Sequence, residues 1–229
     1  MRKIIHPVDF ACRLGPVSSL GPQLRYIDRM AQALLKPLTE DDYLACEALA
    51  TVRHEFVRGK MYAMAGGSAN HNRISGNLYA RLLQSADEKC QPFIADMKLR
   101  VELGAAYYYP DVMLVCDPQD SEAYFKTSPC MVAEVLSPGT ELTDRREKWA
   151  AYQNLPSLHH YLLLAQDRPH IEVYQRVNVR QWGLTVLELG DTLDLGLCGR
   201  SGISSGAICI PVKDIYRGVD FSAAPAALP

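Results

Sequence analysis

The spacing of apolar residues predicts helices and short strands in the first part of the chain. Thr39, with Asp42 three residues later, has the form of a capping box and opens a short helix that ends near Leu49. Two β-like runs within residues 54–64 flank an Arg-Gly-Lys turn and predict a hairpin. A second helix is expected over about 68–88, because apolar residues recur there at spacings of four.

Short apolar runs then predict a sheet. We expect strands over about 92–102, 110–116, 130–136, 159–165, 170–176 and 181–189. The second and third of these runs are apolar almost throughout, as in central strands covered on both faces. A charged amphipathic helix is expected over about 141–154. The fold class is therefore α/β (α+β), with a mixed β-sheet flanked by helices.

The two ends of the chain lack such patterns. Residues 1–36 contain Gly-Pro pairs and no sustained period, so we interpret them as an appended, disordered arm, with Met30 as an alternative start. Residues 37–217 form the predicted domain, and 218–229 a flexible tail. No run approaches the roughly 20 apolar residues of a membrane span, so we expect no membrane partner.

Composition limits the class of protein. The chain has 229 residues, of which 48% are hydrophobic, which suffices for one sizeable core. A formal charge of -2 and a charged fraction of 22% exclude wholesale disorder and a strongly basic, nucleic-acid-coating protein. Any contact with nucleic acid would therefore use a local patch.

The seven cysteines show no C-x-x-C pair, and the histidines are not clustered, so the spacing provides no zinc frame. Cys116 and Cys130 fall inside apolar runs, where a free thiol packs as a small hydrophobe. This usage is typical of a reducing compartment, and we expect a cytoplasmic protein.

Two acidic residues interrupt the apolar runs. Asp111 opens one strand beside Pro110, and Glu134 shares a strand face with Val132 and Leu136. Asp111 alone is most simply a solvent-facing strand end. Burying Glu134 costs several kcal/mol unless a cation compensates it, so the alternatives are a neutralised structural carboxylate, an ion pair with an arginine, or a functional site.

The helix after Glu134 offers a cation. Lys148 lies four residues after Asp144 and four before Tyr152, so the three share one helical stripe and Lys148 can reach back to the acids. The simpler alternative is an exposed pair of Asp144 and Lys148, worth about 0.2–0.5 kcal/mol.

Two carboxylates at neighbouring strand ends with an ammonium group nearby suit a hard divalent cation such as Mg²⁺, which takes oxygen ligands. Such an ion polarises a phosphate oxygen and lowers the pKa of a bound water, while Lys148 orients that water or stabilises the transition state. The chemistry indicated is phosphodiester hydrolysis.

The motif Pro110-Asp111, the run Glu134-Val135-Leu136-Ser137-Pro138-Gly139-Thr140, and then Asp144, Lys148 and Tyr152 resemble the Uma-two family of restriction-endonuclease-like proteins. This family is a branch of the PD-(D/E)XK nuclease superfamily, and the resemblance covers about residues 38–216. It implies a restriction-endonuclease-like core with additional β-strands.

The resemblance also implies roles for single residues. In the superfamily a lysine follows two residues after the second acid, but Leu136 stands there, and Lys148 in the next helix is the counterpart. The carbonyl of Val135 is expected to complete the metal site. Glu55 is similar to an acid contributed from the N-terminal region, and His71 to an active-site histidine; each is otherwise an ordinary solvated acid and a satisfied helix-start histidine.

The leading functional prediction is a Mg²⁺- or Mn²⁺-dependent endonuclease acting on DNA, with Asp111 and Glu134 as metal ligands and Lys148 on the attacking water. Hydrolysis would leave a 5′-phosphate. A homodimer is expected, since cutting both strands of a duplex suits a two-fold assembly. The alternative is a catalytically inactive nuclease-fold module for binding or assembly, which the balanced charge favours mildly.

Overall fold

The structure is a computed structural model, and it describes residues 37–64, 66–86, 89–101, 105–196, 198 and 208–222, together with the backbone of Ile4–Ile5. The predicted N-terminal arm lies outside these residues apart from the short strand β1 (Ile4–Ile5), and so does the tail from 223. The chain forms two compact units. Unit 1 is Met1–Ala65 with Glu102–Tyr108, and unit 2 is Gly66–Val101 with Tyr109–Pro229.

The described residues of unit 1 form one helix and a small antiparallel sheet. Its elements after β1 are α2 (Glu40–Glu47), β2 (His54–Val57), β3 (Lys60–Ala63) and β6 (Ala106–Tyr108). The strands follow the order β1-β3-β2-β6. The predicted short helix and hairpin are confirmed.

Local chemistry explains both elements of unit 1. The Thr39 hydroxyl accepts the Asp42 N–H at 3.1 Å, and the Asp42 carboxylate accepts the Thr39 N–H at 3.0 Å, which completes the capping box. The hairpin turns at Arg58 and Gly59, whose φ angles are +46° and +82°. Two positive φ angles match the right-handed twist of the strands, and glycine adopts one without strain.

Unit 2 is built on a six-stranded mixed sheet, in the order β12-β11-β10-β9-β7-β4. Its strands are β4 (Gln91–Ile94), β7 (Val112–Val115), β9 (Pro129–Val135), β10 (His160–Leu164), β11 (His170–Arg176) and β12 (Trp182–Glu188). Only β9 and β10 run parallel; the other neighbours are antiparallel. The central strands β7 and β9 are buried along their whole length, as their apolar runs predicted.

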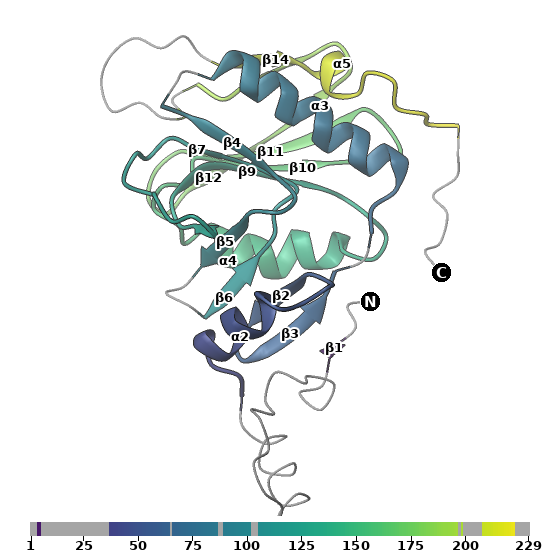
Figure 1. Cartoon of the computed structure of the whole chain (residues 1–229). Helices are drawn as coiled ribbons and strands as arrows, with labels where there is room; N and C mark the ends of the chain where they lie inside the picture. Colours follow the sequence, from purple (N-terminus) through teal and green to yellow (C-terminus); the bar gives the residue numbers. More distant parts are fainter. Residues whose placement is uncertain are drawn as a thin grey trace, which may run out of the picture. The chain divides into compact units, whose positions relative to one another are not determined.

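Helical segments cover both faces of this sheet (Figure 1). The helix α3 (Ala69–Ser85) lies on one face and buries Ile74, Leu78 and Leu82 against it. The π-helical turn η3 (Thr143–Lys148) runs into α4 (Trp149–Tyr152) on the opposite face. The predicted mixed sheet flanked by helices is therefore confirmed. Among the described residues, no helix is long and apolar enough to cross a membrane.

Several elements differ from the sequence prediction. The single strand expected over 92–102 is two strands, β4 and β5 (Lys98–Val101), because the chain turns at Ala95, where φ is +54°. β5 pairs in parallel with β8 (Phe125–Lys126) rather than with the central sheet. The pattern also missed β6, β8, β13 (Thr192–Asp194), β14 (Cys209–Pro211) and α5 (Val212–Ile215).

The prediction of free thiols at Cys116 and Cys130 is wrong. Cys116 is bonded to Cys90, and Cys130 to Cys198, across sequence separations of 26 and 68 residues. Among the described cysteines, Cys46 and Cys209 form no disulfide. Apolar sequence around a cysteine does not distinguish a packed thiol from a disulfide whose partner is distant in the chain.

Candidate active site

Asp111 lies where β7 begins, beside the end of β9. Its carboxylate Oδ2 accepts the backbone N–H of Val135 at 2.7 Å. The side chain is 19% exposed, so the carboxylate is held in place but still reaches solvent. Asp111 is therefore not the free, solvent-facing strand end of the simpler interpretation.

Pro110 explains why the ladder between β7 and β9 stops here. Val112 pairs with Ala133, and this antiparallel register continued by two residues sets Pro110 opposite Val135. Proline has no N–H, so it donates nothing to the Val135 carbonyl. The Val135 carbonyl, the predicted metal ligand, thus lies on the side of β9 that faces Asp111. Pro110, the residue opposite it, has no N–H to donate to it.

Glu134 is compensated by the predicted lysine. Lys148 Nζ lies 3.0 Å from Glu134 Oε1 and 3.0 Å from Asp144 Oδ1. The Tyr152 hydroxyl donates to Glu134 Oε1 at 3.1 Å. The stripe of Asp144, Lys148 and Tyr152 therefore faces the sheet, and the cation is this lysine rather than an arginine.

The simpler interpretation of Lys148, an exposed pair on a solvated helix, is wrong. The exposed fractions of Glu134, Lys148 and Asp144 are 2%, 5% and 1%. At this burial an ion pair is retained only with close geometry, because each charge has lost its hydration. We call Glu134, Lys148 and Asp144 the acid–lysine triad. It has two carboxyl groups and one ammonium group, so acidic groups outnumber basic ones.

A clamp outside the triad holds η3 on the sheet. Arg145 donates two parallel hydrogen bonds of 2.7 Å to the carboxylate of Glu172 in β11, and a third of 2.8 Å to Glu141. The hydrogen bond from Arg145 lowers the pKa of Glu172 below its ordinary value.

The helical segment η3, which carries Asp144 and Lys148, is a π-helical turn. Such turns widen the helix and are frequent at functional sites.

His71 approaches Asp111 from the first turn of α3. The Ser68 side chain caps this helix by accepting the His71 N–H at 3.0 Å, and His71 Nε2 lies 3.1 Å from Asp111 Oδ2. Burial lowers the pKa of His71, but the hydrogen bond and charge of Asp111 outweigh this, so the pKa is raised above 6.5. Of the predicted residues, His71 and Asp111 are thus brought into contact.

Tyr161 is a member of the site that the sequence analysis did not select. Its hydroxyl donates to the Asp144 carbonyl at 3.0 Å, and the residue is completely buried. Burial, followed by the charges of Glu134 and Asp144, raises the pKa of Tyr161 well above 10, so the phenol stays a neutral donor. The available signal in the sequence was a hydroxyl-bearing side chain inside the apolar run of residues 159–165.

Gln166 was also missed. Its Nε2 donates to the Leu136 carbonyl at 2.9 Å, its Oε1 accepts the Ser68 hydroxyl, and its backbone carbonyl accepts from Asn70. One side chain after β10 thereby connects the end of β9 with the start of α3, the two segments that carry Val135 and His71.

Glu55 belongs to β2 in unit 1, where it is buried and lies opposite Tyr62. The other predicted site residues all belong to unit 2. The role of Glu55 as a further acid of the site stays a prediction.

The oxygen donors of Asp111, Glu134 and Val135 are of the type that Mg²⁺ and Mn²⁺ prefer, and Mg²⁺ keeps several waters of its own. Two carboxylates and a carbonyl therefore fit such an ion chemically. Among the residues that the structure describes, in which the clustered cysteines are paired in disulfides, no group of three or more His, Cys, Asp or Glu side chains is arranged as a metal cage. The fit is thus to a partly hydrated hard ion and not to a fully protein-ligated one.

Comparison with known proteins gives a consistent set of matches. The model of the Uma2 family, described as "Putative restriction endonuclease", matches residues 40–209. Two proteins of Synechocystis sp. (strain ATCC 27184 / PCC 6803 / Kazusa) are similar along most of the chain. "Uncharacterized protein sll1609" is 38% identical over 170 residues, 72% of this chain and 96% of that protein. "Uncharacterized protein slr1290" is 35% identical over 188 residues, 80% of this chain and 94% of that protein.

A solved structure has a similar fold. A crystal structure from Anabaena variabilis ATCC 29413, described as "a putative nuclease belonging to DUF820", superposes with a TM-score of 0.59. The superposition covers 79% of this chain and 98% of that one, at 15% identity. At this identity the likeness concerns the fold alone, and it agrees with the mixed sheet flanked by helices.

Proposed function

Because the chain belongs to the Uma2 family of restriction-endonuclease-like proteins, we propose that it is a divalent-metal-dependent endonuclease that hydrolyses phosphodiester bonds of DNA. This membership confirms the resemblance drawn from Pro110-Asp111 and the run that begins at Glu134. One observation carries the proposal. The Asp111 carboxylate accepts a hydrogen bond from the N–H of Val135, and Val135 directly follows Glu134 of the acid–lysine triad.

In this proposal Asp111, Glu134 and the Val135 carbonyl hold the ion. When bound, Mg²⁺ or Mn²⁺ supplies a Lewis acid that polarises a phosphate oxygen and neutralises developing charge. Lys148 is fixed by its two carboxylates, so its ammonium group needs no reorganisation to orient the attacking water or stabilise the transition state.

His71 and Tyr152 are positioning residues in this proposal. His71 donates to the same Asp111 oxygen as Val135 and so fixes the direction of the carboxylate. Tyr152 does the same for Glu134 from the helix side. The rotamers of both ligating acids are therefore set before any ion or phosphate arrives, which limits the ordering cost of the reaction.

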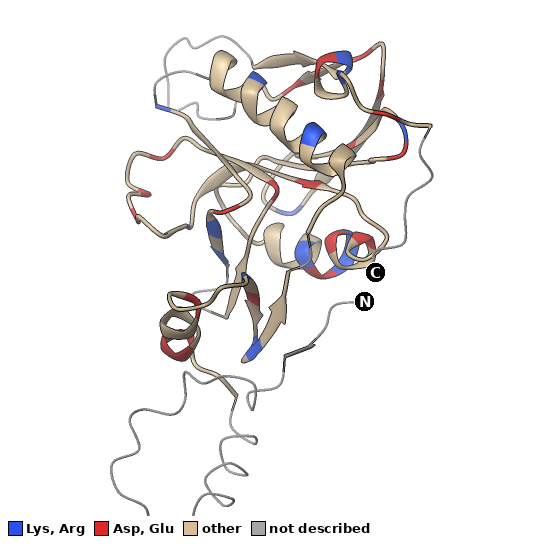
Figure 2. Ribbon diagram, turned by 45° about the vertical axis from the view of Figure 1, so that its right-hand side comes forward, with Lys and Arg blue, Asp and Glu red and all other residues tan. Residues whose placement is uncertain are grey.

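One observation favours the alternative, a nuclease-fold module that binds without cutting. Phosphate contacts supply most of the affinity for DNA, but the net charge is -2. Lysine and arginine residues are scattered over the described elements and are mixed with acids along the helical segment that carries Lys148 (Figure 2). The two functions differ in whether the site cleaves the phosphodiester bonds that it binds.

The test is nicking of supercoiled plasmid by the full chain in Mg²⁺ or Mn²⁺, beside Asp111→Asn and Lys148→Ala variants purified identically. The matched control is Arg168→Ala, which removes an exposed charge outside the site. We expect metal-dependent cutting by the wild type and the control, and a loss of at least about 100-fold in both site variants.

Equal cutting by all four proteins would identify a contaminant and refute the assignment. No cutting by the wild type in either metal, with no stabilisation by Mn²⁺ in a thermal melt, would favour the binding module, since an ion that binds the folded chain must raise its melting temperature.

A further inference from the structure

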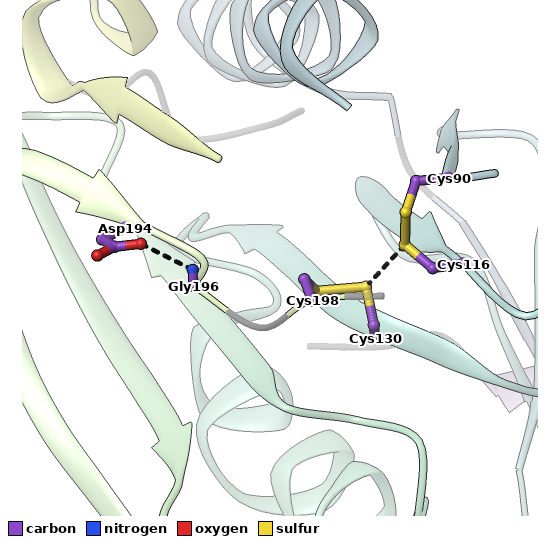
Figure 3. Close-up of a disulfide and its surroundings, with 6 residues drawn as sticks. All are labelled: Cys90, Cys116, Cys130, Asp194, Gly196 and Cys198. Carbon is purple, nitrogen blue, oxygen red and sulfur yellow. Dashed lines mark hydrogen bonds between the residues drawn. A yellow bond between two sulfur atoms is a disulfide. The ribbon is translucent and has the colours of Figure 1, made fainter. Parts of the chain in front are cut away.

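Four cysteines from four separate segments meet in one cluster. Cys90 precedes β4, Cys116 follows β7, Cys130 lies near the start of β9, and Cys198 follows β13. The two disulfides lie next to each other, because Cys116 Sγ and Cys130 Sγ are 3.5 Å apart (Figure 3). All four sulfur atoms therefore occupy one place in the fold.

We propose that the reduced form of this four-cysteine cluster binds a soft tetrahedral divalent ion such as Zn²⁺. In a tetrahedral tetrathiolate site with Zn–S bonds of about 2.3 Å, neighbouring sulfur atoms are about 3.8 Å apart. The 3.5 Å between Cys116 and Cys130, which share no bond, is close to this edge. Cys116 and Cys130 lie at the same end of the adjacent strands β7 and β9, and each is bonded to a cysteine of another segment.

The surroundings suit such a site. Cys90, Cys130 and Cys198 are buried in the apolar core of unit 2, and Cys116 packs against it. A dry, apolar shell excludes water and harder competing ligands from an ion held by thiolates. The predicted absence of a zinc frame rested on spacing along the chain, and spacing does not detect ligands contributed by four distant segments.

The cluster is separate from the candidate active site. Asp111 stands before the first residue of β7 and Cys116 after the last, while Cys130 is near the start of β9 and Glu134 near its end. The antiparallel pairing therefore sets the sulfur cluster and the carboxylates at opposite ends of the same two strands. An ion in the cluster would fix the far end of the strands that position the acids.

The chemistry balances with a dithiol as reductant. Each disulfide takes up two electrons and two protons from one dithiol, which becomes a cyclic disulfide, and the chain gains four thiols. Binding of Zn²⁺ by four thiolates then releases four protons. In the oxidised form the sulfur atoms are bonded to each other, so the cysteine cluster binds the ion only when it is reduced.

The test is a Co²⁺ titration of the full chain, reduced with excess dithiol, then exchanged into buffer without thiol or metal under argon. We expect one Co²⁺ per chain to give the near-ultraviolet thiolate charge-transfer band and the visible bands of a tetrahedral sulfur site, and Zn²⁺ to displace this ion. The oxidised chain should show no thiolate charge-transfer band with Co²⁺, and Zn²⁺ should raise the melting temperature of the reduced chain by more than that of the oxidised chain.

The variants are Cys130→Ser and Cys198→Ser, with Cys209→Ser as the matched control because Cys209 is a free, exposed cysteine. The first two should weaken Co²⁺ binding by more than the roughly 10–100-fold that loss of an outer-shell partner costs, and the control should bind as the wild type does. Circular dichroism of the metal-free variants separates lost binding from lost folding. Absence of the charge-transfer band in the reduced wild-type chain, or equal binding by Cys198→Ser and Cys209→Ser, would overturn the proposal.

Discussion

The two faces of the six-stranded sheet differ in whether buried charges take part in their packing. On one face α3 contacts the sheet through Ile74, Leu78 and Leu82, which are completely buried among apolar neighbours. On the other face η3 and α4 lie over Glu134, and Lys148 joins that acid to Asp144. Both faces exclude water, but one does so with apolar side chains and the other combines buried rings such as Tyr152 and Tyr161 with paired charges.

The difference separates two roles in this fold: the α3 face contributes to stability, and the face under η3 and α4 carries the charged groups of the candidate site. Apolar packing is non-directional and roughly proportional to buried area, so its members can be changed one at a time. A buried ion cluster depends on every partner, because removal of one charge leaves another unpaired in a dry site. Variants on the two faces should therefore differ in kind as well as in size.

The largest effect is expected for Lys148→Met. The substitution conserves length but leaves the buried carboxylates of Glu134 and Asp144 without their shared cation, and should lower the free energy of unfolding by about 3–5 kcal/mol. Urea denaturation measures the change. A double variant that also carries Glu134→Gln should recover part of the loss, and a cost below about 1 kcal/mol for the single variant would mean that the pair is screened by water.

On the apolar face, Leu78→Ala should cost about 2–5 kcal/mol, because the buried leucine leaves a cavity between α3 and the sheet. Cutting per folded molecule should stay at the wild-type level, since the substitution touches no charged partner. Denaturation and plasmid nicking on the same preparation check both parts. Lost activity in a folded Leu78→Ala protein would contradict the view that the α3 face contributes to stability and not to cleavage.

A third prediction concerns acid. His160 in β10 is buried, both ring nitrogens lack a hydrogen-bond partner among the described residues, and burial followed by the charge of His159 lowers its pKa to about 4. The unfolded chain takes up this proton near 6.5, so stability is fully present above pH 6.5 and is lost as the pH falls towards 4, by roughly 3 kcal/mol.

His160→Leu should remove most of this loss, as urea midpoints at pH 7 and pH 4.5 would reveal. The exposed neighbour His159 supplies the control, because His159→Gln should keep most of the acid sensitivity. If His160→Leu and the wild-type chain lose stability equally between the two pH values, His160 is not the acid-sensitive group.

The smallest effect on stability is expected for Gly67→Ala. A Cβ at Gly67 would lie 2.8 Å from Nδ1 of His71, so the ring or the backbone must shift, and we expect this to disturb the contact of His71 with Asp111. Stability should change by less than about 1 kcal/mol, while cutting should fall by about 10-fold, within the range that a misplaced group costs. Gly66→Ala is the matched control, since nothing lies within 4 Å of the added atom there. Equal activity in the two variants would remove His71 from the site.

Local signals in the sequence predicted much of this arrangement. The capping box at Thr39 and the two helices on the sheet depend on residues three or four apart, which a sequence displays directly. The contact of Lys148 with Glu134 followed from the same spacing combined with the need to compensate a buried acid. Each of these inferences used either neighbours in the chain or a single large energetic penalty.

The features that the sequence did not predict depend on contacts between distant segments. The disulfide from Cys130 to Cys198 spans 68 residues, and the paired residues of β13 and β14 are 15 to 19 positions apart. The break at Ala95 requires a positive φ that alanine rarely adopts, so its sequence carries no turn signal. Tertiary contacts decide these cases, and a single sequence does not record them.

Calorimetric titration of Mn²⁺ into the full chain tests the central claim, that the carboxylate end of β7 and β9 is a divalent-metal site. We predict binding by the wild type, loss of that binding in Asp111→Asn, and retention in Cys198→Ser, whose change lies at the opposite end of the strands. Binding that is equal in Asp111→Asn and the wild type, or no Mn²⁺ binding by the folded wild-type chain, would contradict it.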